Sequence, residues 1–259
     1  MYEEFDGVNF VVIGSQRSGL SILQTSLSSH PSAVCHGELL HPSEADRIRL
    51  YHDYFGTSED TELAWFVPVN GSAEQFLSGR VFDRALRGER AIGVTLSYRE
   101  AVKYNLWEYL HDRCLDGDFC VLSVRRNPLA CYVSEMQAKQ TGLRTCVVSD
   151  NVRLYAPSPV ELNVRDLTAF CREQLACDAR LSQLCSDRLE IEFIDLLVDY
   201  RRVISTTFEF LGLSPHPNAR PGVRRLKNRS LADRIVNFDE LRSAVPSDIR
   251  YLFEPDNLF

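Results

Sequence analysis

Short apolar runs alternate with longer amphipathic segments along the chain, and this alternation predicts the fold class. The runs that read as buried strands cover residues 8–13, 33–35, 91–96, 119–124 and 189–194. Apolar residues recur at helical spacing in the remaining segments, near 22–28, 72–86, 98–111, 128–141, 163–186, up to 210, 239–244 and 247–253. Alternating strands and helices are typical of a parallel sheet with helices on both faces. We therefore expect an α/β fold of this kind in a single domain, residues 1–259.

Composition narrows the classes of function. Apolar residues make up 44% and charged residues 25% of the 259 residues, which is ordinary for a globular protein. The net charge of -7 argues against general affinity for nucleic acid. Eight cysteines are present without a Cys-x-x-Cys pair, so a zinc ribbon or a redox pair is not indicated. We expect the cysteines to be reduced thiols.

The start of the chain and its hydropathy bear on location. Residues 1–6 are acidic and lack the pattern of a signal peptide. No apolar run approaches the ~18 residues of a membrane span. We therefore expect a cytoplasmic protein with no stable membrane insertion and no nucleic-acid partner.

The most informative stretch follows the first predicted strand. It reads Gly14-Ser15-Gln16-Arg17-Ser18-Gly19-Leu20-Ser21, a glycine-bracketed turn between a strand and a helix. At such a turn the backbone N–H groups and the helix dipole both point at a bound anion. A chance pair of glycines is the alternative, but the flanking elements and the internal Arg17 favour phosphate binding. The expected fold is therefore P-loop-like.

Residue identities in this loop argue against an ordinary nucleoside triphosphatase. The spacing Gly-x-x-x-x-Gly is that of a P-loop, but Leu20 stands where a triphosphatase needs Lys. Ser21 keeps the Ser/Thr position, and Arg17 is the cation of the loop. No acidic residue follows a strand in the manner that holds magnesium in triphosphatases. Arg17 must therefore supply the positive charge.

A second candidate anion site follows the fourth predicted strand. Arg125 and Arg126 are followed by Asn127 and Pro128, and Pro128 fits the first position of a helix. Ser134 lies eight residues after Arg126, two turns into that helix, where its hydroxyl would supplement the guanidinium. A solvated pair on the rim of the sheet is the alternative.

A third basic cluster lies near the end of the chain, where a solvated tail is the alternative. Its members are Arg220, Arg224, Arg225, Lys227 and Arg229. Three anion sites indicate a ligand with phosphates at two ends.

These motifs together resemble those of the PAPS-dependent sulfotransferases, α/β enzymes that transfer a sulfuryl group from 3′-phosphoadenosine-5′-phosphosulfate (PAPS). The 14–21 loop resembles the family's 5′-phosphosulfate loop, whose basic residue matches Arg17. Residues 123–128 with Ser134 resemble the 3′-phosphate motif, including the spacing from Arg126. The resemblance covers nearly the whole chain. It implies that PAPS contacts Ser15, Gln16, Arg17, Ser18, Gly19, Leu20, Ser21, Arg126 and Ser134, with Arg225 or Arg229 closing over the 3′-phosphate.

Further segments resemble the Nod-factor-type carbohydrate sulfotransferases. They are residues 37–40, 124–128 and 224–241. Residues 191–196 resemble a segment that usually holds a Tyr against the adenine, and Phe193 takes that place here. The early pattern, up to Gly37-Glu38, is shared with the tyrosylprotein sulfotransferases.

In the tyrosylprotein subfamily the residue matching Glu38 is the general base. The resemblance therefore implies that Glu38 and Arg17 are catalytic, with Arg17 at the leaving phosphate. A surface carboxylate is the alternative for Glu38, and His36 and His41 are rival bases.

The chain departs from the family pattern at two places. The family loop usually carries two hydroxyl residues where this chain has Leu20-Ser21. The related enzymes also place a Lys in the third strand, where this chain has Thr95. Arg17 or another basic residue such as Arg99 would take over the role of that Lys.

The resemblance implies sulfuryl transfer from PAPS, without a metal, to an acceptor hydroxyl. The product would be adenosine 3′,5′-bisphosphate. The acceptor is expected on a carbohydrate, a glycolipid or a glycosylated natural product, and a phenol is the alternative. Residues 43–90 and 142–160 are expected to shape its pocket. The alternative is a degenerate P-loop protein, nucleotide-binding or kinase-like, without sulfuryl transfer.

Overall fold

The computed structural model describes residues 7–40, 73–82, 89–142, 158–184, 188–222 and 230–254. The expectations for His41, Arg225 and Arg229 lie outside these ranges, as do most of the two segments expected to shape the acceptor pocket. Within these ranges, none of the helices is long and apolar enough to cross a membrane.

A parallel sheet forms the centre of the described structure. Its strands are β1 (Val8–Gly14), β2 (Ala33–His36), β3 (Ala91–Ser97), β4 (Phe119–Arg125) and β5 (Arg188–Glu192). The spatial order is β2-β3-β1-β4-β5, and every pairing is parallel. The predicted α/β class with a P-loop-like parallel sheet is confirmed.

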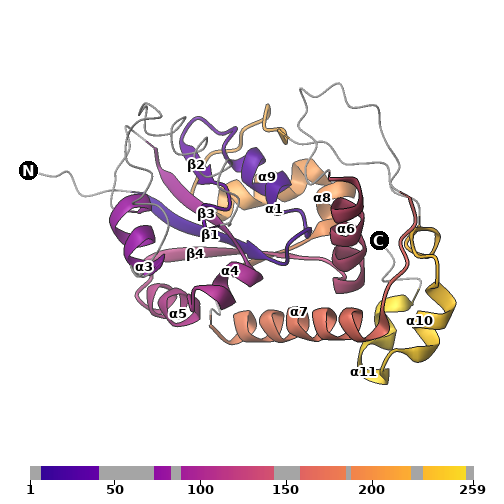
Figure 1. Cartoon of the computed structure of the whole chain (residues 1–259). Coiled ribbons are helices and arrows are strands. Elements are labelled where there is room, and N and C mark those ends of the chain that lie inside the picture. The colour runs from indigo at the N-terminus through magenta and orange to yellow at the C-terminus, as the bar shows by residue number, and fades with distance from the viewer. Residues whose placement is uncertain are drawn as a thin grey trace, which may run out of the picture.

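Helices cover both faces of the sheet, as Figure 1 shows. Along β1, Phe10 and Val12 face one side, where they pack with α1 (Leu20–Leu27) and α9 (Tyr200–Phe210). Val11 and Ile13 face the other side, where they pack with α5 (Trp107–Leu115) and α7 (Val164–Leu184). Both sets of side chains are almost completely buried, as the apolar run in the sequence predicts.

Further elements extend the structure beyond the sheet. They are α6 (Pro128–Thr141), the short helix η3 (Ala232–Arg234), α10 (Phe238–Ala244), α11 (Ser247–Arg250) and η4 (Tyr251–Phe253). Side chains of α6, of α7 and of the C-terminal elements form a third apolar cluster. The C-terminal elements therefore pack against the helix that follows β4 (Figure 1).

The expected helix over 98–111 is two helices, α4 (Tyr98–Lys103) and α5. Asn105 interrupts it with a φ of 52°, in the left-handed region that Asn tolerates better than most residues.

The expected strand over 189–194 ends at Glu192, and Phe193 begins helix α8 (Phe193–Val198). The described part of the expected 72–86 helix consists of α3 (Ala73–Phe76) and a π-helical turn, η2 (Leu77–Val81).

Candidate active site

The motif loops meet at one edge of the sheet. Because the strands are parallel, the segments that follow β1, β2, β4 and β5 all leave the sheet at its C-terminal edge. Ligands of open α/β sheets bind at that edge. Gly14, the last residue of β1, pairs with Ser97 on one side and with Val124 on the other. The glycine loop therefore begins at the centre of this edge.

Backbone geometry requires the two glycines that bracket the loop. A Cβ on Gly14 would lie 2.5 Å from the carbonyl oxygen of Val124 on β4, which cannot move away without disturbing the sheet. Gly19 has a φ of 105°, and a Cβ there would lie 2.7 Å from Cδ2 of Phe193. Arg17 also has a positive φ, 70°, which is uncommon for a non-glycine residue. The loop conformation thus requires glycine at positions 14 and 19.

The loop has donors suited to a phosphate group. Gly19 precedes α1, whose first N–H groups have no carbonyl one turn earlier to bind. Within the described structure, the buried Ser18 hydroxyl has no hydrogen-bond partner. Such a group is costly to bury alone. These features fit a phosphate group, with Arg17 as the adjacent cation.

The two phosphate motifs, distant in sequence, are in direct contact. Nε of Arg17 donates a hydrogen bond to Oγ of Ser134 at 3.2 Å, across 117 residues of sequence. Nη1 of Arg126 donates to the main-chain carbonyl of Arg17 at 2.7 Å. The structure thus brings together the loop residue and both residues predicted for the 3′-phosphate. All three side chains lie at the end of β1 and β4 and on α6.

The resemblance implies that Phe193 contacts the adenine, but in the structure its ring packs against protein groups. Its side chain is 6% exposed. The guanidinium carbon of Arg126 lies 4.1 Å from its ring centre, and its edge contacts Gly19. The ring therefore touches both phosphate loops.

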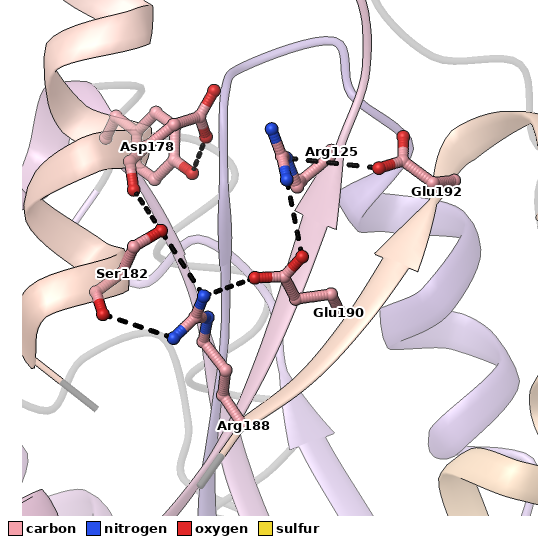
Figure 2. Close-up of polar contacts among 7 residues, drawn as sticks. Arg125, Asp178, Ser182, Arg188, Glu190 and Glu192 are labelled. Carbon is pink, nitrogen blue, oxygen red and sulfur yellow. Dashed lines mark hydrogen bonds and ion pairs between the residues drawn. The ribbon is translucent and has the colours of Figure 1, made fainter. Parts of the chain in front are cut away.

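The two adjacent arginines at the end of β4 have separate partners. Arg125 is exposed and forms ion pairs with Glu190 at 3.3 Å and with Glu192 at 3.9 Å. Figure 2 shows its guanidinium between these two carboxylates of β5. Arg126 turns to the Arg17 loop, as adjacent residues on extended backbone point to opposite sides. Only Arg126 of this pair contacts the 14–21 loop through a hydrogen bond found in the described structure.

The Arg125 ion pairs belong to a wider network. Arg188 also pairs with Glu190, and it donates to Oγ of Ser182 on α7 at 3.3 Å. On the same helix the carboxylate of Asp178 accepts a short hydrogen bond from Tyr98 of α4 (Figure 2). The network links β4, β5 and α7. These contacts stabilise β5, the edge strand that leads into helix α8 and Phe193.

Glu38 lies in the segment that follows β2, at the same edge of the sheet. It is half-buried, and Tyr104, the residue after α4, contacts its segment, since the hydroxyl of Tyr104 donates to the carbonyl of Leu40 at 3.0 Å. The charge of Glu38 also reaches the buried carboxyl of Glu100. Burial first, and the Glu38 charge second, raise the pKa of Glu100 to about 7. Glu38 is therefore set beside a second acid.

The structure describes the rival base His36, Thr95 at the position of the missing Lys, and Arg99, a candidate for the role of that Lys. His36, the last residue of β2, is 8% exposed, and burial lowers its pKa to about 4. Thr95 is buried in β3 with its hydroxyl 3.8 Å from Sγ of Cys35. Arg99 is exposed on α4. Arg17 is thus the cation that the described structure places in the glycine loop itself.

Two features of the site were missed by the sequence reasoning. Ser97 and Glu100 form a capping box, in which Glu100 accepts from the Ser97 N–H at 2.7 Å and from its hydroxyl at 2.8 Å. The spacing Ser-x-x-Glu is a known signature of this motif and would have located it. Asn127 caps α6 and also donates to the carbonyl of Leu252 at 2.8 Å. No local pattern predicts that second contact, which ties the Arg126 segment to the C-terminal elements.

Comparison with solved structures defines the class of the fold. The chain aligns with the sulfotransferase domain of the Synechococcus PCC 7002 olefin synthase at a TM-score of 0.53 and 16% identity, covering 99% of this chain and 92% of that domain. It aligns with the sulfotransferase domain of the curacin biosynthetic pathway at a TM-score of 0.50 and 16% identity, covering 83% and 77%. The fold is therefore that of the sulfotransferases.

Sequence comparison adds a curated relative. No family model matches the chain. Nodulation protein H of Rhizobium tropici is 27% identical over 241 residues, which cover 90% of this chain and 87% of the relative. The predicted resemblance to the sulfotransferases is confirmed.

Proposed function

We propose that the protein is an enzyme that transfers a sulfuryl group from PAPS to a hydroxyl of a carbohydrate, a glycolipid or a glycosylated natural product. The observation that carries the proposal is the contact between the two phosphate motifs, Arg17 with Ser134 and Arg126 with the Arg17 carbonyl. A ligand with a single phosphate group needs only one motif. Two cationic motifs that meet at one edge of a sheet suit a nucleotide with phosphates on both its 5′ and 3′ oxygens.

Each end of this nucleotide has its own residues in the proposal. The loop residues Ser15, Gln16, Ser18, Gly19, Leu20 and Ser21 bind the 5′ end through main-chain N–H groups and hydroxyls. Arg126 and Ser134 bind the 3′-phosphate, and Arg225 or Arg229 closes over it. Positive charge here comes from protein side chains. In the described ranges no group of three His, Cys, Asp or Glu residues could hold a metal ion.

The chemistry needs a base and a stabiliser for the leaving group. PAPS supplies the sulfuryl group: the acceptor oxygen forms the new S–O bond, and the bond from sulfur to the 5′-phosphate oxygen breaks. Glu38 accepts the proton of the acceptor hydroxyl. Arg17 and the loop N–H groups stabilise the negative charge that develops on the 5′-phosphate. The products are the sulfated acceptor, adenosine 3′,5′-bisphosphate and a proton on Glu38 that passes to solvent.

Burial favours Glu38 over His36 as the base. The imidazole of His36 is almost completely buried, and its lowered pKa of about 4 makes it no stronger as a base than a carboxylate. Glu38 is half-buried and follows the strand end directly. His41 remains a rival base that lies outside the described residues.

The proposed acceptor and location follow from the motifs and the thiols. The name of the Rhizobium relative concerns nodulation, and the motifs of the chain resemble those of Nod-factor-type carbohydrate enzymes. A glycan or small-molecule acceptor in the cytoplasm is our proposal. Free thiols at Cys35, Cys131 and Cys171 are in keeping with a reducing compartment.

The buried Thr95 favours a second candidate function. The related enzymes have a Lys at this position of the third strand, whereas the Thr95 hydroxyl lies beside the thiol of Cys35. A protein that binds the nucleotide without turnover is consistent with the loss of that Lys. Binding and transfer measurements on the same protein separate the two candidates.

The test has a binding step and a transfer step. Thermal unfolding is followed with adenosine 3′,5′-bisphosphate and, separately, with ATP and magnesium. We expect stabilisation by the bisphosphate alone, since bound ligand raises the unfolding temperature by mass action. Labelled sulfate transfer from PAPS is then measured on a panel of glycans and phenols. Stabilisation by the bisphosphate without transfer to any acceptor would favour the non-catalytic candidate. Stabilisation only by ATP would exclude both the transferase and the protein that binds the PAPS nucleotide without turnover.

A further inference from the structure

Phe193 is placed where it touches both phosphate loops and almost no solvent. Its ring lies beneath the guanidinium of Arg126, 4.1 Å from the guanidinium carbon to the ring centre. This distance is well within the range of a cation–π contact. Only 6% of the side chain is exposed. The face of the ring toward Arg126 is therefore already covered by protein.

The same ring also lies against the glycine loop. A Cβ on Gly19 would lie 2.7 Å from Cδ2 and 3.0 Å from Cε2 of Phe193. Gly19 is the residue from which α1 begins, with a φ of 105°. The aromatic edge thus lies directly under the turn that would bind the 5′ end of the nucleotide.

Arg126 completes a closed set of contacts. It stacks on Phe193 and, through Nη1, donates to the carbonyl of Arg17 at 2.7 Å. A guanidinium that is held by a ring on its face and a carbonyl at its edge has few rotamers left. The orientation of the guanidinium is then set before any ligand binds, which lowers the entropy cost of binding a phosphate.

We infer that Phe193 is a positioning residue for both phosphate sites, holding Arg126 through its face and Gly19 through its edge, and that it does not stack on the nucleotide base. The inference rests on the proposed function, since it concerns the same PAPS site. It replaces the adenine contact that the sequence resemblance implies for this residue.

The test uses ligands that differ in the base and in the 3′-phosphate. Affinities are measured by calorimetry for adenosine 3′,5′-bisphosphate, thymidine 3′,5′-bisphosphate and AMP, with wild-type protein, Phe193→Leu and Phe193→Tyr. We expect Phe193→Leu to weaken both bisphosphates by the same factor, about tenfold for the loss of a desolvated cation–π contact. Phe193→Tyr keeps the ring and retains the affinity. A loss confined to the adenine bisphosphate and AMP would overturn the inference.

Two controls separate positioning from general destabilisation. Phe208→Leu removes another buried ring, on α9, which packs against His30, so we expect a lower unfolding temperature with unchanged affinities. An equal affinity loss in Phe208→Leu would count against the inference. Arg126→Lys keeps the charge but not the planar stack. If Phe193 acts through Arg126, the double variant Phe193→Leu/Arg126→Lys loses less affinity than the product of the two single-variant losses. Strictly additive free-energy losses would contradict the inference.

One readout does not depend on any nucleotide. Aromatic ring current shifts the side-chain N–H resonances of a guanidinium that lies over a ring. We expect the Arg126 resonance in wild-type protein and in Phe193→Tyr to be shifted, and in Phe193→Leu to return to the ordinary position. An unshifted wild-type resonance overturns the inference. Failure of the wild-type protein to bind either bisphosphate instead overturns the proposed function, so the two failures are distinguishable.

Discussion

Nε of Arg17 lies 3.2 Å from Oγ of Ser134, and these two residues come from motifs 117 residues apart. Arg17 follows β1 and Ser134 lies in the second turn of α6, so the contact exists only because β1 and β4 are neighbours in the sheet. The guanidinium proposed for the leaving group is therefore anchored by the hydroxyl proposed for the 3′-phosphate. This bond and the one from Arg126 to the Arg17 carbonyl connect the two ends of the proposed nucleotide site.

Ser134→Ala tests this coupling. The variant loses a hydroxyl that contacts Arg17 and that we assign to the 3′-phosphate. We expect adenosine 3′,5′-bisphosphate to bind about 10- to 100-fold more weakly, as for loss of a hydrogen bond to a charged group. AMP, which lacks the 3′-phosphate, should lose much less.

Ser243→Ala is the matched control, measured by the same calorimetry. Its hydroxyl, on α10, donates to the carbonyl of Asp239 and is exposed. Binding of both nucleotides should match wild type in this variant. Equal losses for AMP and the bisphosphate in Ser134→Ala would show that Ser134 does not read the 3′-phosphate.

Gly19→Ala tests the shape of the glycine loop. The new Cβ has no room beside Phe193 and the φ of 105° is strained for alanine. We expect both AMP and the bisphosphate to bind more weakly, by about tenfold or more, because about 1–3 kcal/mol of strain is relieved by moving the loop.

Gly117→Ala separates backbone strain from loop function. Gly117 has a similar positive φ of 74° and lies in the turn before β4, and an added Cβ there would have no other atom within 4 Å. Both variants should unfold at lower temperature, but only Gly19→Ala should lose nucleotide affinity. Normal affinity in Gly19→Ala would show that the loop conformation is not needed for binding.

Residues adjacent in sequence made the phosphate motifs predictable. The strand, the two glycines and the helix start are neighbours along the chain, and the eight-residue spacing of Arg126 and Ser134 spans a single turn-and-helix unit. The five strands were likewise predicted, because buried parallel strands are short runs of continuous apolar residues.

The environment of Phe193 could not be predicted in the same way. Residues 189–194 alternate as a strand does, yet β5 ends at Glu192, and no side chain caps the helix that begins at Phe193. The separation of Arg125 from Arg126 depends on Glu190 and Glu192 of the neighbouring strand. Both are tertiary effects, which local patterns do not contain.

Glu38→Gln tests the proposed general base. The amide keeps the size of the side chain but cannot accept the proton of the acceptor. We expect turnover to fall by about 10²- to 10⁴-fold while the affinity for adenosine 3′,5′-bisphosphate is unchanged. Transfer assays and calorimetry on the same preparation measure both. Full turnover in the variant would rule out the base role and leave His36 and His41 as candidates.

The buried acid beside Glu38 gives a prediction about stability and pH. Glu100 is 2% exposed, and its pKa is raised from 4.5 to about 7, by burial first and by the Glu38 charge second. Folding therefore favours the protonated carboxyl. The stabilising contribution is fully present below pH 4.5 and is lost as the pH rises through about 7. In this window the unfolded chain has released a proton that the folded protein still holds.

Glu100→Gln removes this titration but can keep the capping box, which accepts Gln as well as Glu at this position. We expect the free energy of unfolding of the variant, relative to wild type, to rise with pH across the window, by up to about 3 kcal/mol at ~1.4 kcal/mol per unit. Denaturant titrations from about pH 4 to about pH 8 measure it. Glu190→Gln is the control that should show little pH dependence in this range, since Arg188 lowers the pKa of Glu190 from 4.5 and its window therefore lies below pH 4.5. In a Glu38→Gln background the pH window of Glu100 should move to lower pH, because one of the two causes that raise the pKa of Glu100 is gone.

A pH-independent difference between wild type and Glu100→Gln would show that Glu100 is already ionised in the folded protein and that its charge is compensated.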